Sequence, residues 1–202
     1  MSVCATGTVF VIDDDDFILD VHCQVLRSAE FEVRSFNSAA AFLASYQPKR
    51  CECILTDLRM PNLSGFELYQ QLSANAIDTP VIFITGHADV PSAVEAMRQG
   101  AFDYVEKPVH AGHLRARVRA ALSVSAERYD QRQAQELKEQ QLALLTPKER
   151  EIAQWVARGY TSREIAECSA LSVRTVENHR ARLMDKLNAH SVVDVVRLLL
   201  HT

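Results

Sequence analysis

The sequence predicts an α/β domain with a doubly wound, five-stranded parallel sheet, followed by a small all-α domain. Short apolar runs alternate with helical patterns through residues 1–124, as in parallel sheets that helices cover on both faces. Residues 146–202 instead hold repeated helix-start signals. Residues 1–124 carry 15 acidic and 10 basic side chains, whereas residues 146–202 carry 7 and 9. Two domains with different partners are therefore expected.

Five segments of the first domain have the composition of strands. Residues 8–12, TVFVI, form an apolar run rich in β-branched side chains, and residues 31–36, FEVRSF, alternate as a half-exposed strand does. The other predicted strands are 51–56, 80–85 and 102–106. Because the segments between them are helical, the strands are expected to lie parallel in one sheet, with ligands bound beyond their carboxyl ends.

Apolar residues at helical spacing fill the segments between the strands. The positions that predict these helices are Phe17, Val21 and Val25; Phe66, Tyr69 and Leu72; and Val90, Ala93, Val94 and Met97, with Gly100 as the stop. A last helix begins near residue 110 and carries a stripe at Leu114, Val118, Ala121 and Leu122. It continues into AERYDQRQAQELKEQQ, which we interpret as a helical linker over 125–145, the alternative being a disordered polar tether.

The last domain, residues 146–202, is predicted to contain four short helices. Capping boxes begin at Thr146 and Thr161, Ser172 and Ser191 can cap two more helices, and Gly159 can end the first. Helices joined by such tight turns are typical of a helix-turn-helix unit. The predicted domains are therefore 1–124, 125–145 and 146–202.

The composition excludes several classes of protein. The chain of 202 residues is 48% hydrophobic and 24% charged, which suits a globular protein. Its start, MSVCATGT, lacks the features of a signal peptide, and no run of 18 apolar residues could span a bilayer. Five cysteines without a C-x-x-C pair favour reduced thiols and a cytoplasmic location.

Charged and hydroxyl side chains follow four of the predicted strands. Asp13 and Asp14, Asp57, Thr85 and Lys107 all come just after a strand end. Two carboxylates about 4 Å apart repel by about 4 kcal/mol at an effective dielectric of 20, so converging aspartates need a cation. Mg²⁺ prefers such oxygen ligands, and a hydroxyl and an ammonium can stabilise a phosphoryl group that moves onto Asp57. Taken singly, each residue also fits a turn, a helix cap or a solvated lysine.

The stretches VFVIDDDD, ILTDLRMPNLSGFEL and PVIFITGHADVPSAVEAMRQGAFDYVEKP closely resemble the receiver domain (CheY-like, flavodoxin-like fold) of bacterial two-component response regulators, most of all the FixJ subgroup. The resemblance covers residues 8 to about 124 and implies a regulator that a sensor histidine kinase phosphorylates, rather than an enzyme. It implies these roles: Asp57 as phosphoacceptor; Asp13, Asp14, Asp57 and the backbone carbonyl of Arg59 as Mg²⁺ ligands; Thr85 and Lys107 as phosphoryl-binding residues; Tyr104 as the aromatic switch; and a cis Lys107–Pro108 peptide. Asp15 is expected to start the first helix, where negative charge is favourable.

The resemblance also implies a surface that pairs two copies on phosphorylation. It comprises residues 88–99 and 102–106 and carries Val90, Val94 and Met97, which equally fit ordinary core packing. Arg59 and His87 stand where relatives control the water that attacks the phosphoryl group.

The stretch from about 145 to 200 resembles the LuxR-type helix-turn-helix of the FixJ/NarL class. Residues 172–187, SVRTVENHRARLMDKL, are expected to form the recognition helix, which enters the major groove of double-stranded promoter DNA. The expected DNA contacts are Arg174, Thr175, Glu177, Asn178, His179, Arg180, Ala181, Arg182 and Lys186. RNA polymerase is an expected partner. The alternatives are a solvated helical bundle, and for His179 a packed side chain.

The leading interpretation is a cytoplasmic, phosphorylation-dependent transcription factor. A haloacid-dehalogenase-type phosphatase is the alternative from another class, since Asp13 and Asp15 imitate its D-x-D motif. Phe17 and Ile18 stand where that family has small residues. A phosphorylation-independent regulator is the third interpretation, which the intact acidic pair, Thr85 and Lys107 disfavour.

Overall fold

The computed structural model describes residues 7–86 and 95–200, and for Thr85 and Leu200 the backbone alone. The chain divides into two compact units between Gln131 and Arg132, and each unit is described by itself. Among the described residues, no helix is both long enough and apolar enough to cross a bilayer.

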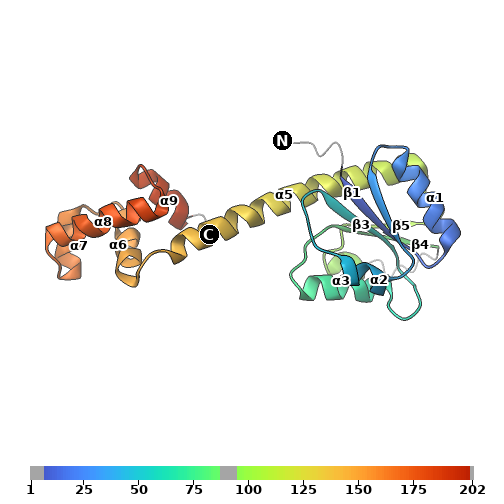
Figure 1. Ribbon diagram of the computed structural model, residues 1–202, viewed down its shortest axis with the longest axis horizontal. Helices are drawn as coiled ribbons and strands as arrows, with labels where there is room; N and C mark the ends of the chain where they lie inside the picture. The colour runs from blue at the N-terminus through green and yellow to red at the C-terminus, as the bar shows by residue number, and fades with distance from the viewer. Residues whose placement is uncertain (1–6, 87–94, 201–202) are drawn as a thin grey trace. The chain divides into compact units, whose positions relative to one another are not determined.

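The first unit is built on a five-stranded, fully parallel sheet of order β2-β1-β3-β4-β5 (Figure 1). Its strands are β1 (Thr8–Ile12), β2 (Glu32–Phe36), β3 (Glu52–Asp57), β4 (Val81–Thr85) and β5 (Asp103–Glu106). The predicted fold class and all five strands are confirmed, with each bound within one residue. β3 lies at the centre and is buried along its whole length, as expected of a strand that helices cover on both faces.

Helices pack on both faces of this sheet. Helices α1 (Asp16–Arg27) and α5 (Ala111–Ala143) share one core cluster with the sheet, and α2 (Ala39–Ser45) and α3 (Gly65–Ala74) share the other (Figure 1). Residues 95–98 are helical and Gly100, at φ +93°, follows their last turn. Val90, Ala93 and Val94, which predicted this helix, lie outside the described residues.

The start of α1 explains part of the acidic run. The Asp15 side chain accepts hydrogen bonds from the backbone N–H groups of Phe17 and Ile18, so Asp15 is the N-cap and its predicted role is confirmed. The helix that Phe17, Val21 and Val25 predict is confirmed, and Val25 packs against the core. Phe17 is 74% exposed and Val21 39%, because the face that packs on the sheet is Leu19, His22, Cys23 and Leu26.

α5 is one helix of 33 residues that ends at Ala143, so residues 125–143 are helical as expected and a disordered tether is not supported. Beyond its apolar stripe, polar contacts hold it to the first unit. The Arg50 guanidinium pairs with Asp130 at 2.8 Å, and Arg128 donates to the carbonyl of Asp78 at 2.8 Å. These contacts extend the packing of α5 against the first unit by about one and a half turns past Ser125.

The thiol prediction holds for three cysteines. Cys23 and Cys53 are buried free thiols, and Cys168 is an exposed one. Cys51 is disulfide-bonded, so the expectation of reduced thiols is wrong for this residue.

The second unit contains α6 (Pro147–Ala157), α7 (Ser162–Ser169), α8 (Val173–Leu187) and α9 (Val192–Leu200). The Thr146 and Thr161 capping boxes are both present, and Ser172 caps α8 as predicted. Gly159, at φ +87°, ends α6. A compact apolar core joins the four helices and includes Ile152, Val156, Ile165, Val176, Leu183, Leu187 and Val195.

One ion pair joins α6 to the end of α8. Glu149 is 3% exposed, and its carboxylate accepts the Lys186 ammonium at 2.7 Å and the Thr146 backbone N–H at 2.9 Å. The Lys186 hydrogen bond first, and then the Thr146 N–H, lower the pKa of Glu149 to about 2.

We expect Glu149→Gln to remove a pH-dependent part of the stability of the second unit. Because the pKa of Glu149 falls from 4.5 to about 2 on folding, its contribution is present above pH 4.5 and is lost as the pH falls toward 2. Urea unfolding at pH 7 to 3, followed by the fluorescence of Trp155, the single tryptophan, should show this loss in the wild type and a flatter dependence in the variant. Glu151→Gln, which breaks the exposed pair with Lys148, is the matched control, and an equal effect of both variants would contradict the assignment.

Gly65→Ala should destabilise the first unit by about 1–3 kcal/mol through overpacking. A Cβ at Gly65 would lie 2.1 Å from the backbone oxygen of Asp57, and backbone cannot move aside cheaply. Gly112→Ala, a helical position whose Cβ meets nothing within 4 Å, should instead be neutral or stabilising by about 0.5–1 kcal/mol. Urea midpoints of the two variants measure the contrast, and equal midpoints would refute it.

Candidate functional site

The carboxyl ends of four strands meet at one edge of the sheet. The register pairs Ile12 with Thr56, so Asp13 and Asp57 leave their strands side by side. Thr85 pairs with Glu106, so Lys107 follows β5 at the same edge. The parallel topology therefore brings together residues that are up to 94 positions apart in the chain.

Lys107 links the two buried aspartates at this edge of the sheet. Its ammonium donates to Asp13 Oδ2 at 2.8 Å and to Asp57 Oδ1 at 2.8 Å. Asp13 is 3% exposed and Asp57 9%, so both carboxylates are largely removed from water. Burial by itself would lower the pKa of Lys107, but the hydrogen bonds to the two aspartates and their negative charges outweigh burial and raise it. The lysine is thus held charged between two buried anions.

The remaining carboxylate oxygens are oriented by backbone N–H groups. Asp13 Oδ1 accepts the N–H of Asp15 at 3.0 Å, and Asp57 Oδ2 accepts the N–H of Arg59 at 2.8 Å. Gly65 permits the start of α3 to press against the backbone of Asp57, since any side chain there would collide with it. The loop after β3 therefore fixes the direction of the Asp57 carboxylate.

The sequence prediction missed one titratable residue near the site. His22 lies on the buried face of α1 and is 9% exposed. Burial first, and then the charge of Lys107, lower the pKa of His22, while Asp13 and Asp57 act in the opposite direction. The spacing of Leu19, His22 and Leu26 at helical intervals was the signal that could have placed His22 on this face.

The other predicted site residues are placed as follows. Asp14 is exposed beside Asp13, Thr85 ends β4 with its backbone alone described, and Tyr104 is half-buried against the core cluster of α2 and α3. The Lys107–Pro108 peptide is cis, as predicted. His87 lies outside the described residues.

The donor set at this edge fits Mg²⁺. Within the described parts of the chain, no three Asp, Glu, His or Cys side chains are grouped closely enough to hold a metal by themselves. Mg²⁺ does not need such a cage, because it takes one or two carboxylates and completes its shell with carbonyl, water and phosphate oxygens. Asp13, Asp57, the exposed Asp14 and the Arg59 carbonyl are oxygen donors of that kind.

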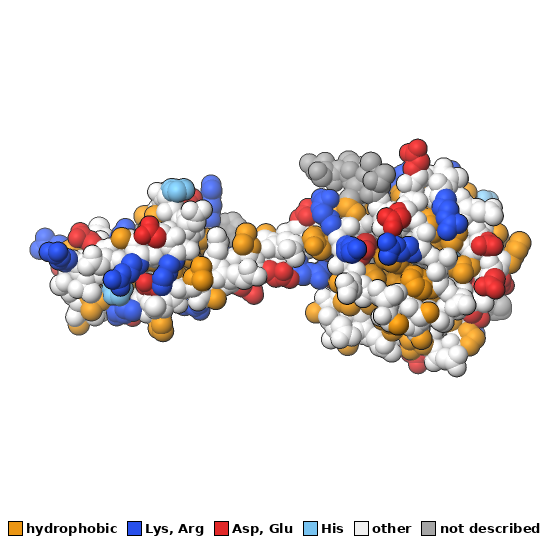
Figure 2. All heavy atoms as spheres, in the orientation of Figure 1, with side chains coloured by type: hydrophobic (Ala, Val, Ile, Leu, Met, Phe, Trp, Pro, Cys, Tyr) orange, Lys and Arg blue, Asp and Glu red, His pale blue; other side chains and the backbone are white. Residues whose placement is uncertain are grey.

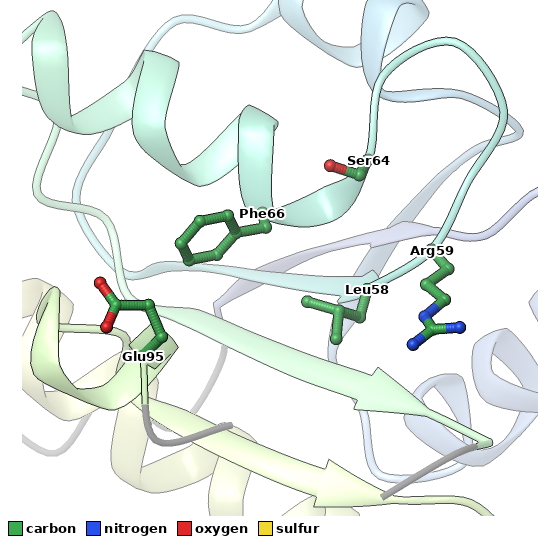
Figure 3. A pocket seen from close by; sticks show the side chains of 5 residues that line it. All are labelled: Leu58, Arg59, Ser64, Phe66 and Glu95. Carbon is green, nitrogen blue, oxygen red and sulfur yellow. The ribbon is translucent and has the colours of Figure 1, made fainter. Parts of the chain in front are cut away.

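A cavity of about 250 Å³ opens next to the end of β3. It is lined by Leu58, Arg59, Ser64, Phe66 and Glu95. Figure 3 shows Phe66 of α3 and Glu95 facing the same space, with Leu58 and Arg59 at the strand end. The cavity therefore connects the loop after Asp57 with the helix that contains residues 95–98.

In the second unit, α8 divides into a buried and an exposed face. Val176, Leu183 and Leu187 are buried, as predicted. The exposed candidates for DNA contact are Arg174, Glu177, Asn178, Ala181 and Arg182. On the visible side of this unit, Lys and Arg side chains are spread over the helices among fewer acidic ones (Figure 2).

Four of the predicted DNA contacts are half-buried. Thr175 bonds to the Ser172 hydroxyl at 2.8 Å, and Arg180 donates to the Tyr160 carbonyl at 3.4 Å. Nδ1 of His179 is buried without a hydrogen-bond partner among the described residues, which accords with the packed alternative. Lys186 pairs with Glu149, so its ammonium has a role inside the domain, and its contact with phosphate stays a prediction.

Two family models match the chain. Residues 9–119 match the response regulator receiver domain, and residues 143–199 match the bacterial regulatory proteins of the luxR family. Neither match is to a haloacid-dehalogenase-type phosphatase, so that alternative is not supported.

Whole-length relatives share both parts in the same order. The chain is 40% identical over 191 residues to the tetrathionate response regulatory protein TtrR of Salmonella typhimurium and 42% identical over 192 residues to the transcriptional regulatory protein FixJ of Azorhizobium caulinodans. Each alignment covers 95% of this chain and 91% of the relative.

Solved structures agree with these matches. The response regulator StyR is similar with a TM-score of 0.88 at 37% identity, covering 97% of this chain and 99% of StyR. Full-length FixJ from B. japonicum is similar with a TM-score of 0.58 at 35% identity, covering 96% of both chains. The chain therefore belongs to the family of two-component response regulators that join a receiver domain to a LuxR-type DNA-binding domain.

Proposed function

We propose that Asp57 accepts a phosphoryl group from a phosphohistidine of a sensor kinase and that this event controls dimerisation and the binding of promoter DNA. The observation that carries the proposal is the Lys107 ammonium, which lies at hydrogen-bond distance from the Asp57 carboxylate at the edge where the strands end. We take residues 1–124 as the receiver, 125–145 as the linker and 146–202 as the DNA-binding domain. We place the protein in the cytoplasm, where kinase and DNA are both accessible.

The chain's own residues supply most of the chemistry. A carboxylate oxygen of Asp57 forms a bond to phosphorus while the bond from phosphorus to the imidazole nitrogen of the donor breaks. The Arg59 N–H holds the carboxylate in direction, and Lys107 is placed to pair with a phosphoryl oxygen. Asp13, Asp14, Asp57 and the Arg59 carbonyl would hold Mg²⁺, which when bound offsets the negative charge of the phosphoryl oxygens.

Phosphorylation changes the charge that Lys107 balances. The aspartyl phosphate carries a charge of about −1.5 to −2 at about pH 7, whereas the carboxylate that it replaces carries −1, so the site gains up to about one negative charge. Lys107 would therefore turn from Asp13 toward the phosphoryl oxygens, with Thr85 as the second group that binds them. Tyr104 is half-buried at the neighbouring strand, so it can move inward as the switch residue.

The expected readout is pairing of two copies and reading of DNA by α8. Within the predicted pairing surface, Met97 is 46% exposed while Ala96 is fully buried, so the apolar side chain of Met97 is accessible to a partner. A net charge of +2 in residues 146–202 gives one copy weak attraction to DNA. Two linked copies on adjacent half-sites would gain affinity through effective concentration. RNA polymerase is the partner through which a bound dimer would act.

Asp57→Ala should abolish both phosphorylation and its effect on DNA. Wild-type protein with acetyl phosphate and Mg²⁺ should gain one phosphoryl group by intact mass, sediment as a heavier species and protect promoter DNA at lower concentration. Asp16→Asn, which alters an exposed first-turn residue of α1, is the matched control and should behave as the wild type. Labelling of the Asp57→Ala variant to the wild-type level would sink the proposal. Steady turnover of a chromogenic phosphate ester would instead show an enzyme.

Asn178→Ala should weaken binding to the cognate promoter by about 1–3 kcal/mol while leaving nonspecific binding nearly unchanged, because an amide reads a base edge. Arg174→Gln should weaken both kinds of binding and reduce the slope of log K against log salt by about 1, since we assign it to a phosphate. Fluorescence anisotropy at several salt concentrations separates the two effects. Glu167→Gln on α7 is the control, and uniform weakening by Asn178→Ala would contradict base reading.

A further inference from the structure

A cavity at the amino-terminal edge of the sheet has the features of a ligand site. It has a volume of about 240 Å³ and lies at the opposite end of the strands from Asp57. α2 is only seven residues long, so it leaves the first residues of β1, β2 and β3 uncovered on its face of the sheet. The register places Thr8 between Glu32 and Glu52, and Phe10 beside Arg34, so these side chains form one wall.

The cavity contains a buried carboxylate that forms no ion pair among the described residues. Glu52 is 3% exposed, and its Oε2 accepts the Lys49 backbone N–H at 2.7 Å and the Tyr46 hydroxyl at 3.2 Å. Within the described residues, Oε1 has no donor and Glu52 has no ion pair, yet Oε1 is not sealed from solvent. Burial raises the pKa of Glu52, and the hydrogen bonds from the Lys49 N–H and the Tyr46 hydroxyl, with the charges of Lys49 and Arg34, offset this effect only in part. A cationic ligand group would satisfy this carboxylate.

The rest of the lining supplies one unpaired positive charge and an aromatic wall. Arg34 and the Thr8 hydroxyl are both engaged with Glu32, at 3.2 Å each. The Lys49 ammonium has no ion pair among the residues that the structure describes, and Lys49 lines the same cavity. The rings of Phe10 and Tyr46 stand edge to face with centroids 5.2 Å apart, a surface suited to alkyl carbons and to an ammonium group.

We propose that this cavity binds a small zwitterion of the amino-acid type, whose ammonium group pairs with Glu52 and whose carboxylate pairs with Lys49. Opposite charges that line one cavity, neither in an ion pair among the described residues, match a ligand that carries both charges better than a simple amine or a simple acid. The near-neutral lining, two acids against two bases, agrees with a ligand of zero net charge.

The site is separate from the phosphoacceptor and would add a second input to the regulator. The backbone N–H of Glu52 donates to the Ser125 hydroxyl of α5 at 2.9 Å, and the Tyr46 hydroxyl bonds to Thr79 at 2.6 Å. A ligand that holds Glu52 would therefore strengthen the attachment of α5 to the start of β3. The proposal does not depend on phosphorylation of Asp57.

Binding can be tested on the full chain with probes matched in size. Alanine and 4-aminobutyrate are the zwitterions, butylamine the cation and butyrate the anion. In amide NMR spectra, at least one zwitterion should shift residues around the cavity saturably below about 50 mM, a range in which weak ligands are measurable. Butylamine and butyrate should each bind about tenfold more weakly or worse, since each lacks one charge-assisted contact.

Variants identify the two charged partners. Glu52→Gln keeps the shape of the side chain and should weaken the zwitterion about tenfold or more, as should Lys49→Gln on the surface. Glu32→Gln alters the already engaged rim carboxylate and should leave affinity within about twofold. If Glu52→Gln fails to fold, as judged by circular dichroism, the affinity of the Lys49→Gln variant still tests the proposal.

Absence of saturable shifts from both zwitterions, equal binding of butylamine, or unchanged affinity in the Lys49→Gln variant would each overturn the proposal. A positive result with the Asp57→Ala variant would keep this site distinct from the phosphoacceptor function.

Discussion

The ammonium of Lys107, shared between Asp13 and Asp57, is the interaction on which the rest of the first unit depends. Two carboxylates that are this deeply buried and this close would repel each other strongly in a poorly polarisable interior, so a cation must lie between them. That cation comes from a third strand, so β1, β3 and β5 must end at one level. The parallel register and the two apolar core clusters therefore hold the strand ends at one level, and the site depends on them as much as on its charged residues.

Local signals in the sequence predicted the elements well, and tertiary packing decided what they could not. Strand composition and capping boxes are short-range features, so β1 and the caps at Thr146 and Thr161 could be predicted. Which face of α1 is buried depends on the sheet beneath it, so the buried position of His22 was missed. The resemblance to receivers placed Asp57 and Lys107 correctly at one edge. No pattern in the sequence indicated that Lys186 would pair with Glu149 or that Cys51 would be disulfide-bonded.

α8 shows how one helix can pack into a domain core and still present the side chains that we propose to contact DNA. Its apolar stripe and the Lys186 ammonium face the other helices, while Arg174, Asn178 and Arg182 remain exposed. The formal charge of residues 146–202 therefore overstates the number of cations that are accessible to DNA phosphates, because Lys186 pairs with Glu149 inside the unit. Specific reading by a few exposed residues, supported by pairing of two copies, is consistent with such a modest surface charge.

The four consecutive aspartates are not interchangeable, although they are identical letters. Asp13 is buried against Lys107, Asp14 is exposed, Asp15 caps α1 and Asp16 lies in its first turn. Loss of any one of them yields the same shortened chain, in which every later residue of α1 moves one place closer to the cap. At 3.6 residues per turn, that slip rotates the helix by about 100°. This rotation would turn Phe17 and Val21 toward the sheet, or Leu19 and Leu26 away from it. The number of aspartates, more than their charge, therefore determines which face of α1 packs on the sheet.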